Sequence, residues 1–251
     1  MLNERRSQIL DAVNLRGTMT FSALMQMFPN ISEMTLRKDL KSLDEEGKLV
    51  RIHGGARSLD TVLNADAPLT QRLSQNMELK REIALQARAL VQPGMTVFMD
   101  SGSTMTELAK AFQDVPCTVF TGGLTCVQEL SRLTQADVFV LGGRVNKSSM
   151  SVRDARLASD LKELYFDVAF ISVNGFSKEN GFSCRSADRW YMERTAVSRA
   201  SLVVVLIDST KVGRVCSLSI CGPDGIDKLV SDSGLDAETR EALESAGVEV
   251  L

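Results

Sequence analysis

One stretch of the sequence combines residue types that suit the binding of an anion. FMDSGSTMTELAKAF, residues 98–112, predicts a strand that ends at Asp100, a turn at Gly102 and a helix that begins with hydroxyl side chains. Glycine lets the backbone approach a ligand closely, and the first turn of a helix has N–H groups without helical partners. A glycine turn with a hydroxyl helix cap is the alternative interpretation. We call this possible site for a phosphate or another anion the cradle. Its residues are Asp100, Ser101, Gly102, Ser103 and Thr104.

Other apolar runs of the sequence end in the same kind of small or polar residue. Lys211 follows the run 202–207 and is the best candidate for a phosphate or carbonyl partner, with a surface lysine as the alternative. Asp208, like Asp100, suits the hydroxyl groups of a ligand. Ligands of open α/β sheets bind beyond the carboxyl ends of the strands, so these positions are candidates for one site. Equivalent strand ends carry Thr121, Gly122, Gly142, Gly143 and Asn174.

A second candidate surface lies on a helix that the sequence predicts from its cap, Ser32, to about residue 46. With a rotation of about 100° per residue, Leu40 and Leu43 fall within about 40° of Leu36 and form a core stripe. The N-terminal half of the opposite face is therefore cationic. The candidate contacts of this surface are the cap Ser32 and, on that face and its flanks, Met34, Thr35, Arg37, Lys38 and Lys41.

These cations have the chemistry that DNA recognition requires. Arg37 and Lys38 can reach guanine edges or phosphates, and Thr35 can meet a phosphate or a thymine methyl group. An ordinary solvated helix face explains the same charges, so the helix geometry alone leaves both interpretations open. The glycine turn that follows adds Arg51, His53 and Arg57, which suit contacts with the DNA backbone or the minor groove.

The first 58 residues predict three helices and a hairpin, the order of a winged helix-turn-helix. The first helix spans residues 3–16, the second runs from a cap at Thr20 to Pro29, and the third is closed by Gly47. KLVRIHGGARSL then reads as two short strands around a glycine turn. Residues 1–58 are therefore the expected DNA-binding domain, and residues 59–75, which lack a clean period, are the expected linker.

Residues 76–251 predict an α/β domain. A helix, KREIALQARALV, precedes apolar runs separated by helical stretches, and continuous β-branched runs of this kind are typical of a parallel sheet buried on both faces. The runs are TVFMDSGST, CTVFTGG, DVFVLGG, VAFISVNG, LVVVLIDST, DKLVSD and VEVL.

Composition excludes several classes of site. The five cysteines are odd in number and form no C-x-x-C pair, and there is one histidine, so we expect no disulfide framework, metal site or Ser-His-Asp triad. No apolar run approaches the length of a membrane span, which indicates a cytoplasmic protein. Residues 1–58 contain nine basic and seven acidic side chains, whereas residues 59–251 contain 20 and 25, a mild asymmetry typical of a DNA-binding head on an acidic body.

SEMTLRKDLKSLDEEGKLVRIHGGA resembles the N-terminal signature of the DeoR family of bacterial sugar-operon regulators, V-S-x-x-T-[IL]-R-R-D-L followed by a glycine-ended helix and R-x-H-G-G-A. The resemblance continues through MTVFMDSGST and LIDSTKVG to the end of the chain. It implies a winged helix-turn-helix before a larger parallel-sheet domain similar to sugar-phosphate isomerases and CoA transferases. It also implies a transcriptional regulator, a repressor of a carbohydrate-metabolism operon, whose α/β domain binds a phosphorylated sugar. We expect no cofactor, and a homodimer or higher homo-oligomer on DNA.

The sequence departs from the family pattern in four places. One is the turn FPNIS between the second and third helices, which is one residue longer than is usual, so the angle between those helices is expected to differ. Lys38 stands where a second arginine is usual and cannot make its planar contact. Asn174 stands where an aspartate is frequent, and residues 189–191 replace an acidic stretch with Arg-Trp-Tyr. The lost acids argue against catalysis, because isomerisation of a sugar phosphate needs a general base. The alternatives are an enzyme that converts sugar phosphates and carries an accessory DNA-binding head, and a scaffold without a ligand.

Overall fold

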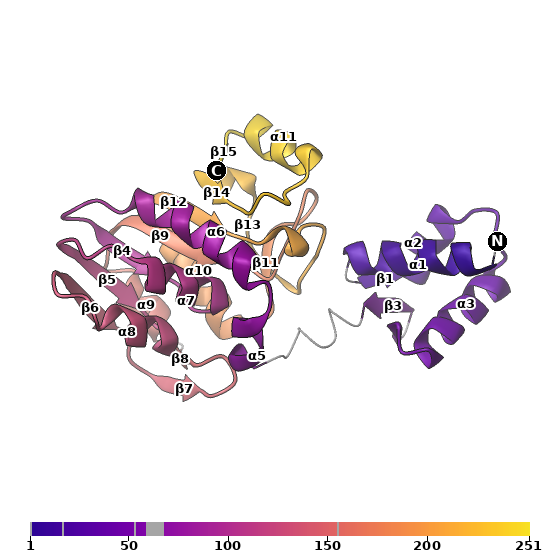
Figure 1. The fold of residues 1–251 in the computed structure, drawn as a ribbon, viewed down its shortest axis with the longest axis horizontal. Coiled ribbons are helices and arrows are strands. Elements are labelled where there is room, and N and C mark those ends of the chain that lie inside the picture. The colour runs from indigo at the N-terminus through magenta and orange to yellow at the C-terminus, as the bar shows by residue number, and fades with distance from the viewer. Residues whose placement is uncertain (1, 17, 53, 59–67, 155) are drawn as a thin grey trace. The chain divides into compact units, whose positions relative to one another are not determined.

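The computed structural model describes residues 2–16, 18–52, 54–58, 68–154 and 156–251 (Figure 1). The chain divides into two compact units. The smaller unit contains residues 1–67 with the short segment 213–215, and the larger unit contains residues 68–212 and 216–251.

The smaller unit has the predicted three helices and hairpin. Its sheet is antiparallel with the strand order β1-β3-β2. Strand β1 was not predicted, because three residues between two helices carry no periodic signal. The elements are α1 (Leu2–Arg16), β1 (Thr18–Thr20), α2 (Phe21–Met27), α3 (Glu33–Glu45), β2 (Leu49–Ile52) and β3 (Gly55–Ser58).

The ends of these helices follow from the capping residues that the sequence supplies. The Thr20 side chain accepts a hydrogen bond from the backbone N–H of Ala23 at 3.1 Å, and Ser32 accepts one from Thr35 at 3.2 Å. Gly47, with φ +65°, closes α3 in a left-handed conformation that glycine adopts without strain. The predicted caps of α2 and α3 are therefore confirmed.

The two glycines of the hairpin turn have separate structural reasons. Gly54 has φ +82°, which L side chains rarely adopt, and a Cβ on Gly55 would lie 2.0 Å from the Met19 carbonyl oxygen. The close approach lets β1 pair with β3. The glycine pair thus fixes the fold of the wing.

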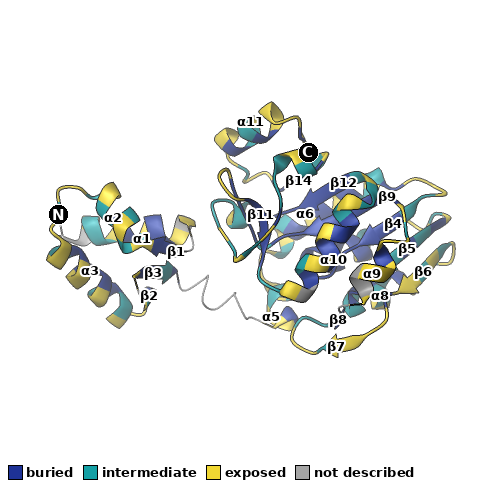
Figure 2. Cartoon of the chain, turned by 180° about the vertical axis from the view of Figure 1, so that it is seen from behind, coloured by how far each residue is buried: buried dark blue, intermediate teal, exposed yellow. Residues whose placement is uncertain are grey.

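The predicted core stripe of α3 is confirmed. Leu36, Leu40 and Leu43 are buried, and they pack in one cluster with Ile9 of α1 and Leu24 of α2. The opposite face of α3 is left to solvent, as the exposed colouring of this helix in Figure 2 shows.

The larger unit is built on a seven-stranded sheet with the order β15-β14-β12-β9-β4-β5-β6, in which neighbouring strands are parallel. Each of the seven predicted apolar runs contributes one strand, so the α/β prediction is confirmed. The strands are β4 (Thr96–Met99), β5 (Cys117–Thr121), β6 (Ala136–Val140), β9 (Phe166–Ser172), β12 (Ala200–Leu206), β14 (Lys228–Val230) and β15 (Glu249–Val250).

Helices cover both faces of this sheet. Side chains of α6, α7 and α8 join one buried cluster, and side chains of α9, α10 and α11 join the cluster on the other face. Figure 2 shows the central strands of the sheet buried between these layers. The helices are α5 (Leu69–Ser74), α6 (Met77–Ala87), α7 (Ser103–Ala111), α8 (Leu124–Leu130), α9 (Leu157–Leu161), α10 (Ala187–Ser198) and α11 (Ala237–Ser245), with 3₁₀ turns η1 (Arg88–Leu90), η2 (Ser209–Lys211) and η3 (Pro223–Gly225).

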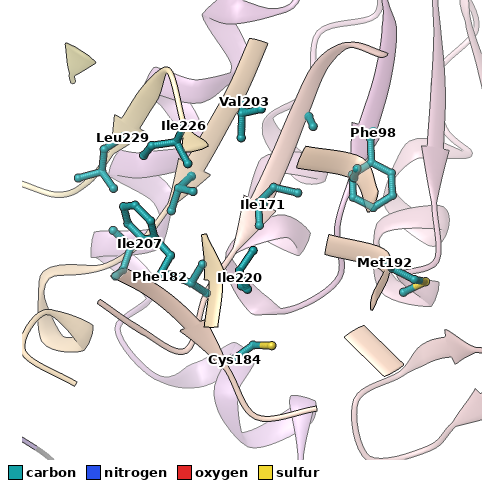
Figure 3. Close-up of a cluster of buried hydrophobic side chains, with 14 of the residues drawn as sticks. Phe98, Ile171, Phe182, Cys184, Met192, Val203, Ile207, Ile220, Ile226 and Leu229 are labelled. Carbon is teal, nitrogen blue, oxygen red and sulfur yellow. The ribbon is translucent and has the colours of Figure 1, made fainter. Parts of the chain in front are cut away.

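A small antiparallel sheet and a hairpin complete the larger unit, and neither was predicted. The small sheet has the order β10-β11-β13. Its Phe182 and Ile220 pack with Ile207, which follows β12, and with Leu229 of β14 (Figure 3). These strands have three or four residues each, too few for a period to register. They are β7 (Arg144–Asn146), β8 (Ser151–Arg153), β10 (Gly175–Ser177), β11 (Gly181–Cys184) and β13 (Leu218–Cys221).

The end of the expected linker is part of the larger unit. Helix α5 falls within residues 59–75, its Leu69 side chain is buried, and its backbone N–H donates to the carbonyl of Ser148 at 2.7 Å. Residues 59–67 lie outside the described residues. The stretch 68–75 had been taken for linker because six helical residues are too few for a recognisable apolar period.

Candidate functional site

The exposed face of α3 carries the cations that the sequence placed there. Met34 is 68% exposed, and the side chains of Arg37 and Lys41 are 60% and 63% exposed. Lys38 is also exposed. One helix face therefore presents three cations to solvent.

Two of these cations are already engaged on the protein surface. Arg37 Nη2 lies 2.6 Å from Glu33 Oε1, and Lys41 Nζ lies 3.6 Å from Glu45 Oε1. Exposed pairs of this kind contribute at most about 1 kcal/mol, so a DNA phosphate can replace the carboxylates at little cost.

Arg37 also lies next to the wing. Its guanidinium carbon is 4.4 Å from the centroid of the Phe21 ring, and the same hollow is lined by Arg51 and Ile52. Arg51 is exposed, and its backbone N–H donates to Asp44 Oδ1 at 3.1 Å. The fold thus places Arg37 of α3 and Arg51 of the wing on the same hollow.

The remaining predicted DNA contacts differ in their placement. The Ser32 and Thr35 hydroxyl groups are 2.8 Å apart and take part in the helix cap. Arg57 is half-buried, and its Nε atom is buried without a hydrogen-bond partner among the described residues. His53 lies outside the described residues.

A buried carboxylate that the sequence analysis missed fixes α3 on α1. Asp39 is 1% exposed, and it accepts hydrogen bonds from Arg5 Nε at 2.6 Å and from Arg6 Nε at 3.0 Å. Burial alone would raise the pKa of Asp39, but the two arginines outweigh it and hold the pKa below its ordinary value. The signal was present, because residue 39 follows Leu36 by three positions and therefore lies near the core stripe.

In the larger unit, the carboxyl ends of β4 and β9 meet at the point where the strand order reverses. The chain runs from β4 to β5 and β6, and then returns to β9 on the other side of β4. Asp100 follows β4, and its Oδ2 accepts hydrogen bonds from Ser172 N at 3.2 Å and Ser172 Oγ at 2.9 Å. Such switch points are where open α/β sheets bind ligands.

The loop from β4 into α7 has the predicted glycine turn followed by a helix. Gly102 has φ +125°, and α7 begins at Ser103 without a side-chain cap on its N-terminal N–H groups. The first N–H groups of a helix have no helical acceptors and favour negative charge. Ser101, Ser103 and Thr104 are buried in this loop.

The strand ends beyond β4 are less uniform. The fully buried Thr121 hydroxyl accepts a hydrogen bond from Gly123 N at 3.1 Å, so it has a structural partner. Gly122 accepts a backbone hydrogen bond from Val152. Among the described residues, no hydrogen bond or ion pair joins Gly142, Gly143 or Asn174 to Asp100. Gly142 and Gly143 are exposed after β6, and Asn174 is half-buried with its backbone N–H bonded to Ser183.

Arg189 fills the polar centre of this switch point. It is 9% exposed, and its Nη2 donates to Asp100 Oδ2 at 2.8 Å, to the Ser172 carbonyl at 2.9 Å and to Glu193 Oε1 at 2.5 Å. The sequence had marked residues 189–191 only as a loss of acids. An acid outside that stretch, Glu193, lies one turn further along α10 and is buried against the arginine.

The charges in this centre depend on one another. Burial lowers the pKa of Arg189, but the neighbouring carboxylates outweigh burial and raise it. Burial raises the pKa of Glu193 to about 7, because loss of water outweighs the attraction of Arg189 and Asp100 adds repulsion. Asp100 had been expected to hold ligand hydroxyls, yet its Oδ2 already accepts from Ser172 and Arg189.

A second group of cations lies around Asp208. Lys211 Nζ is 3.2 Å from Asp208 Oδ2, which keeps the two predicted residues together. Lys80 is 4% exposed, and its Nζ donates to the Arg72 carbonyl at 2.6 Å and to the Gln75 carbonyl. Burial lowers the pKa of Lys80 to about 8, and the charge of Lys211 adds to this effect.

Arg72 reaches the cradle from α5. A Cβ placed on Gly102 would lie 4.0 Å from Arg72 Nη1, and burial and the charge of Arg189 both lower the pKa of Arg72 while Asp100 opposes them. The sequence analysis missed Arg72 because it lies in the expected linker. It missed Lys80 because a lysine in an amphipathic helix is usually on the surface.

Other chemistry finds little support in the described parts of the chain. No group of three or more His, Cys, Asp or Glu side chains there is arranged to hold a metal ion. The helices that are described include none long and apolar enough to cross a bilayer. Trp190 donates from Nε1 to the Ser219 carbonyl at 2.5 Å and packs against the core.

Two family models match the chain. The "DeoR C terminal sensor domain" matches residues 75–233, and the "DeoR-like helix-turn-helix domain" matches residues 5–62. The helix-turn-helix match includes α3, and the sensor-domain match includes the switch point between β4 and β9.

Several curated proteins are similar over nearly the whole chain. The HTH-type transcriptional regulator GlpR of Haloferax volcanii is 30% identical, and the match spans 99% of this chain and 96% of the relative. A lactose phosphotransferase system repressor of Staphylococcus epidermidis is 30% identical over 99% of this chain and 98% of its own. The HTH-type transcriptional regulator GolR of Listeria innocua is 29% identical, with 98% and 97% covered.

Two solved structures are similar to part of the chain. Ribose 5-phosphate isomerase A from Methanocaldococcus jannaschii has a TM-score of 0.41 and 17% identity, and the match covers 55% of each chain. A probable sor operon regulator from Shigella flexneri has a TM-score of 0.40 and 9% identity over 54% of this chain and 77% of that one.

Proposed function

Because the chain belongs to the DeoR family of helix-turn-helix transcriptional regulators, we propose that it represses a carbohydrate-metabolism operon and that a phosphorylated sugar bound in the larger unit weakens its grip on operator DNA. The named relatives support this proposal, since one is a repressor of a lactose phosphotransferase system. They are named as regulators rather than enzymes. The protein acts in the cytoplasm, where its DNA and its effector are found.

The observation that carries the effector proposal is the switch point between β4 and β9. A phosphate group would bind at Gly102 and the uncapped first turn of α7, with Ser101, Ser103 and Thr104 around it. Lys211 and Asp208 would hold the phosphate and the sugar hydroxyls from the neighbouring strand end. Further ligand contacts would come from Asp100, Thr121, Gly122, Gly142, Gly143 and Asn174.

On the smaller unit, the exposed cations of α3 would enter the major groove. Arg37 and Lys38 would read bases or phosphates, Lys41 would contact the backbone, and Met34 and Thr35 would pack against base edges or sugars. Ser32, at the N-terminus of α3, would contact a phosphate. The wing would add Arg51, His53 and Arg57 on the backbone or in the minor groove.

The active form would be a homodimer or a higher oligomer. One small head makes few base contacts, and two heads on paired half-sites multiply them. The effector must bind one arrangement of the subunits better than another, because equal affinity for both would leave DNA binding unchanged.

The proposal is tested by DNA binding. Fragments upstream of the protein's own gene and its neighbours are titrated in a fluorescence anisotropy assay at moderate salt, with and without a panel of sugar phosphates. We expect one fragment to be retained above a scrambled control and to be released by one sugar phosphate. Retention of no fragment, or release by no sugar phosphate, would overturn the corresponding half of the proposal.

A further inference from the structure

We propose that the hollow between α2, α3 and the wing binds one backbone phosphate of the DNA, that Arg37 and Arg51 hold this phosphate together, and that Phe21 positions Arg37 for it. This inference rests on the proposed function and deepens it, because it assigns Arg37 to a phosphate instead of a base edge and gives Phe21 a part in DNA binding. Three observations on the smaller unit carry it.

The first observation is the composition of the hollow. It has a volume of about 80 Å³, and Arg37 of α3 and Arg51 of β2 both line it. The rest of its lining consists of apolar side chains and the backbone of Gly54 and Gly55, and among the described residues no acidic side chain belongs to it. The volume exceeds what a single water molecule needs, so a larger anionic group has room there.

The second observation is how Arg37 is held at the hollow. Its guanidinium carbon lies 4.4 Å from the centroid of the Phe21 ring, and its Nε and Nη2 donate to Glu33 Oε1 at 3.2 Å and 2.6 Å. Phe21 N donates to the Gly54 carbonyl at 2.7 Å, which ties the ring to the turn of the wing. A guanidinium group has five N–H donors, so the pair with Glu33 leaves three of them for another acceptor. The ring therefore holds a cation that still has donors to offer.

The third observation is that Arg51 approaches the same hollow from another element. Arg51 lies opposite Ala56 in the β2–β3 hairpin, and its backbone N–H donates to Asp44 Oδ1 at 3.1 Å. Two guanidinium groups that converge on one hollow repel each other until an anion lies between them. A phosphate accepts hydrogen bonds from several directions, whereas a guanine edge offers two acceptors in one plane and suits a single arginine. The convergence of Arg37 and Arg51 therefore favours a phosphate.

This assignment changes what Arg37 contributes to recognition. Phosphate contacts fix the position of a protein on the duplex but do not read its sequence. Sequence reading then falls to the other exposed side chains of α3, among them Met34, Thr35 and Lys38.

The experiment compares the full-length wild type with Arg37→Ala, Arg51→Ala and the double variant. The matched control is Arg16→Ala, which removes an exposed arginine of α1 that does not line the hollow. Fluorescence anisotropy gives the affinity for the retained operator fragment and for a scrambled duplex at a series of salt concentrations. Circular dichroism spectra and unfolding midpoints establish that each variant is folded.

We expect Arg37→Ala to weaken binding to both duplexes by the same factor, about tenfold, because a lost phosphate contact weakens binding to every sequence alike. The slope of log affinity against log salt should fall by about one in the double variant, since each neutralised phosphate contributes about 0.9. Two separate phosphates would lower it by about two. Arg16→Ala should keep the slope of the wild type.

The role of Phe21 is tested by Phe21→Leu and Phe21→Tyr. Phe21→Leu should weaken binding to both duplexes about two- to fivefold, and Phe21→Tyr, which keeps a ring under the guanidinium group, should match the wild type. Added to Arg37→Ala, Phe21→Leu should cause no further loss, because the ring acts through Arg37. A defect in folding would instead lower the affinity in both backgrounds, and that result, or an unchanged affinity of Phe21→Leu, would overturn the role of Phe21.

Two results would overturn the shared phosphate. One is a loss in Arg37→Ala confined to the operator fragment, which would mean that Arg37 reads a base, and the other is a fall of about two in the slope of the double variant. The scrambled duplex separates this failure from that of the proposed function. If a sugar phosphate releases the operator and Arg37→Ala removes only the preference for the operator, the proposed function stands and this inference fails. If the variants change binding to the scrambled duplex as expected but no fragment is retained above it, the inference stands and the proposed function fails.

Discussion

The two charged regions of this protein use arginine–carboxylate pairs in opposite ways. On α3, Arg37 and Glu33 form a pair whose side chains are 60% and 62% exposed. At the switch point, Arg189 pairs with Asp100 and Glu193, whose side chains are 1% and 0% exposed. The exposed pair is weak and can give way to a partner, whereas the buried group is costly to break and holds three elements together.

The difference in burial suits the α3 face and the switch point to different kinds of binding. A DNA-binding face needs cations that exchange a protein partner for a phosphate at little cost. An effector site needs donors that are already in position, because ordering them on binding would reduce the affinity for a small ligand. The buried centre supplies this order, and the cradle and Arg72 lie at its edge.

The largest expected effect is on the buried centre. Arg189→Ala leaves Asp100 and Glu193 buried without their cation, and we expect the free energy of unfolding of the larger unit to fall by about 3–5 kcal/mol. Urea unfolding followed by circular dichroism measures this loss. Arg194→Ala, an exposed position on the same helix, is the control and should change the value by no more than about 1 kcal/mol. Equal effects of the two substitutions would remove the contrast between buried and exposed pairs.

A pH dependence gives the next effect. The pKa of Glu193 in the folded protein is about 7, above the ordinary value of 4.5, so between these pH values the folded state binds more protons than the unfolded state. The free energy of unfolding due to this group therefore falls as pH rises through that window. Glu193→Gln, which mimics the protonated acid, should gain about 1–3 kcal/mol relative to the wild type between about pH 5 and about pH 8.

This prediction is measured by urea unfolding of both proteins at a series of pH values. Glu163→Gln, at an exposed position, should keep a constant difference from the wild type. Parallel pH curves for the wild type and Glu193→Gln would mean that Arg189 holds Glu193 ionised throughout.

The exposed pair should give the smallest effect. Glu33→Ala frees Arg37 and removes a negative charge from the DNA-binding face. We expect the free energy of unfolding to change by no more than about 1 kcal/mol, while operator affinity at low salt rises about two- to fivefold. Anisotropy titrations at two salt concentrations measure the second effect, and a fall in affinity would show that Glu33 positions Arg37 for DNA.

The parts of the fold that depend on local sequence were predictable. The apolar runs located all seven strands of the main sheet, and capping residues located the starts of α2 and α3. The stripe of Leu36, Leu40 and Leu43 gave the buried face of α3, and hence its exposed face. These features depend on residues within a few positions of one another, so a single sequence contains the information.

The parts that depend on tertiary contacts were not predictable. Arg189 meets Asp100 across 89 positions of the chain, and no local pattern marks that pair. Arg72 comes near Gly102 only through the position of α5 in the fold, and Asp39 meets Arg5 and Arg6 of α1 only once the helices have packed. The glycine turn before α7 was predicted from the sequence, but the charged side chains around it were not.

The division of labour between the two regions is tested most directly by two substitutions measured side by side. Operator affinity by anisotropy and stabilisation by the effector in thermal unfolding are recorded for Arg37→Ala and Lys211→Ala. We expect Arg37→Ala to weaken DNA binding by about tenfold or more and to leave effector stabilisation intact. Lys211→Ala should weaken effector stabilisation and leave DNA binding without effector intact. If both substitutions change both measurements to the same extent, the assignment of DNA to the α3 face and of effector to the strand ends is wrong.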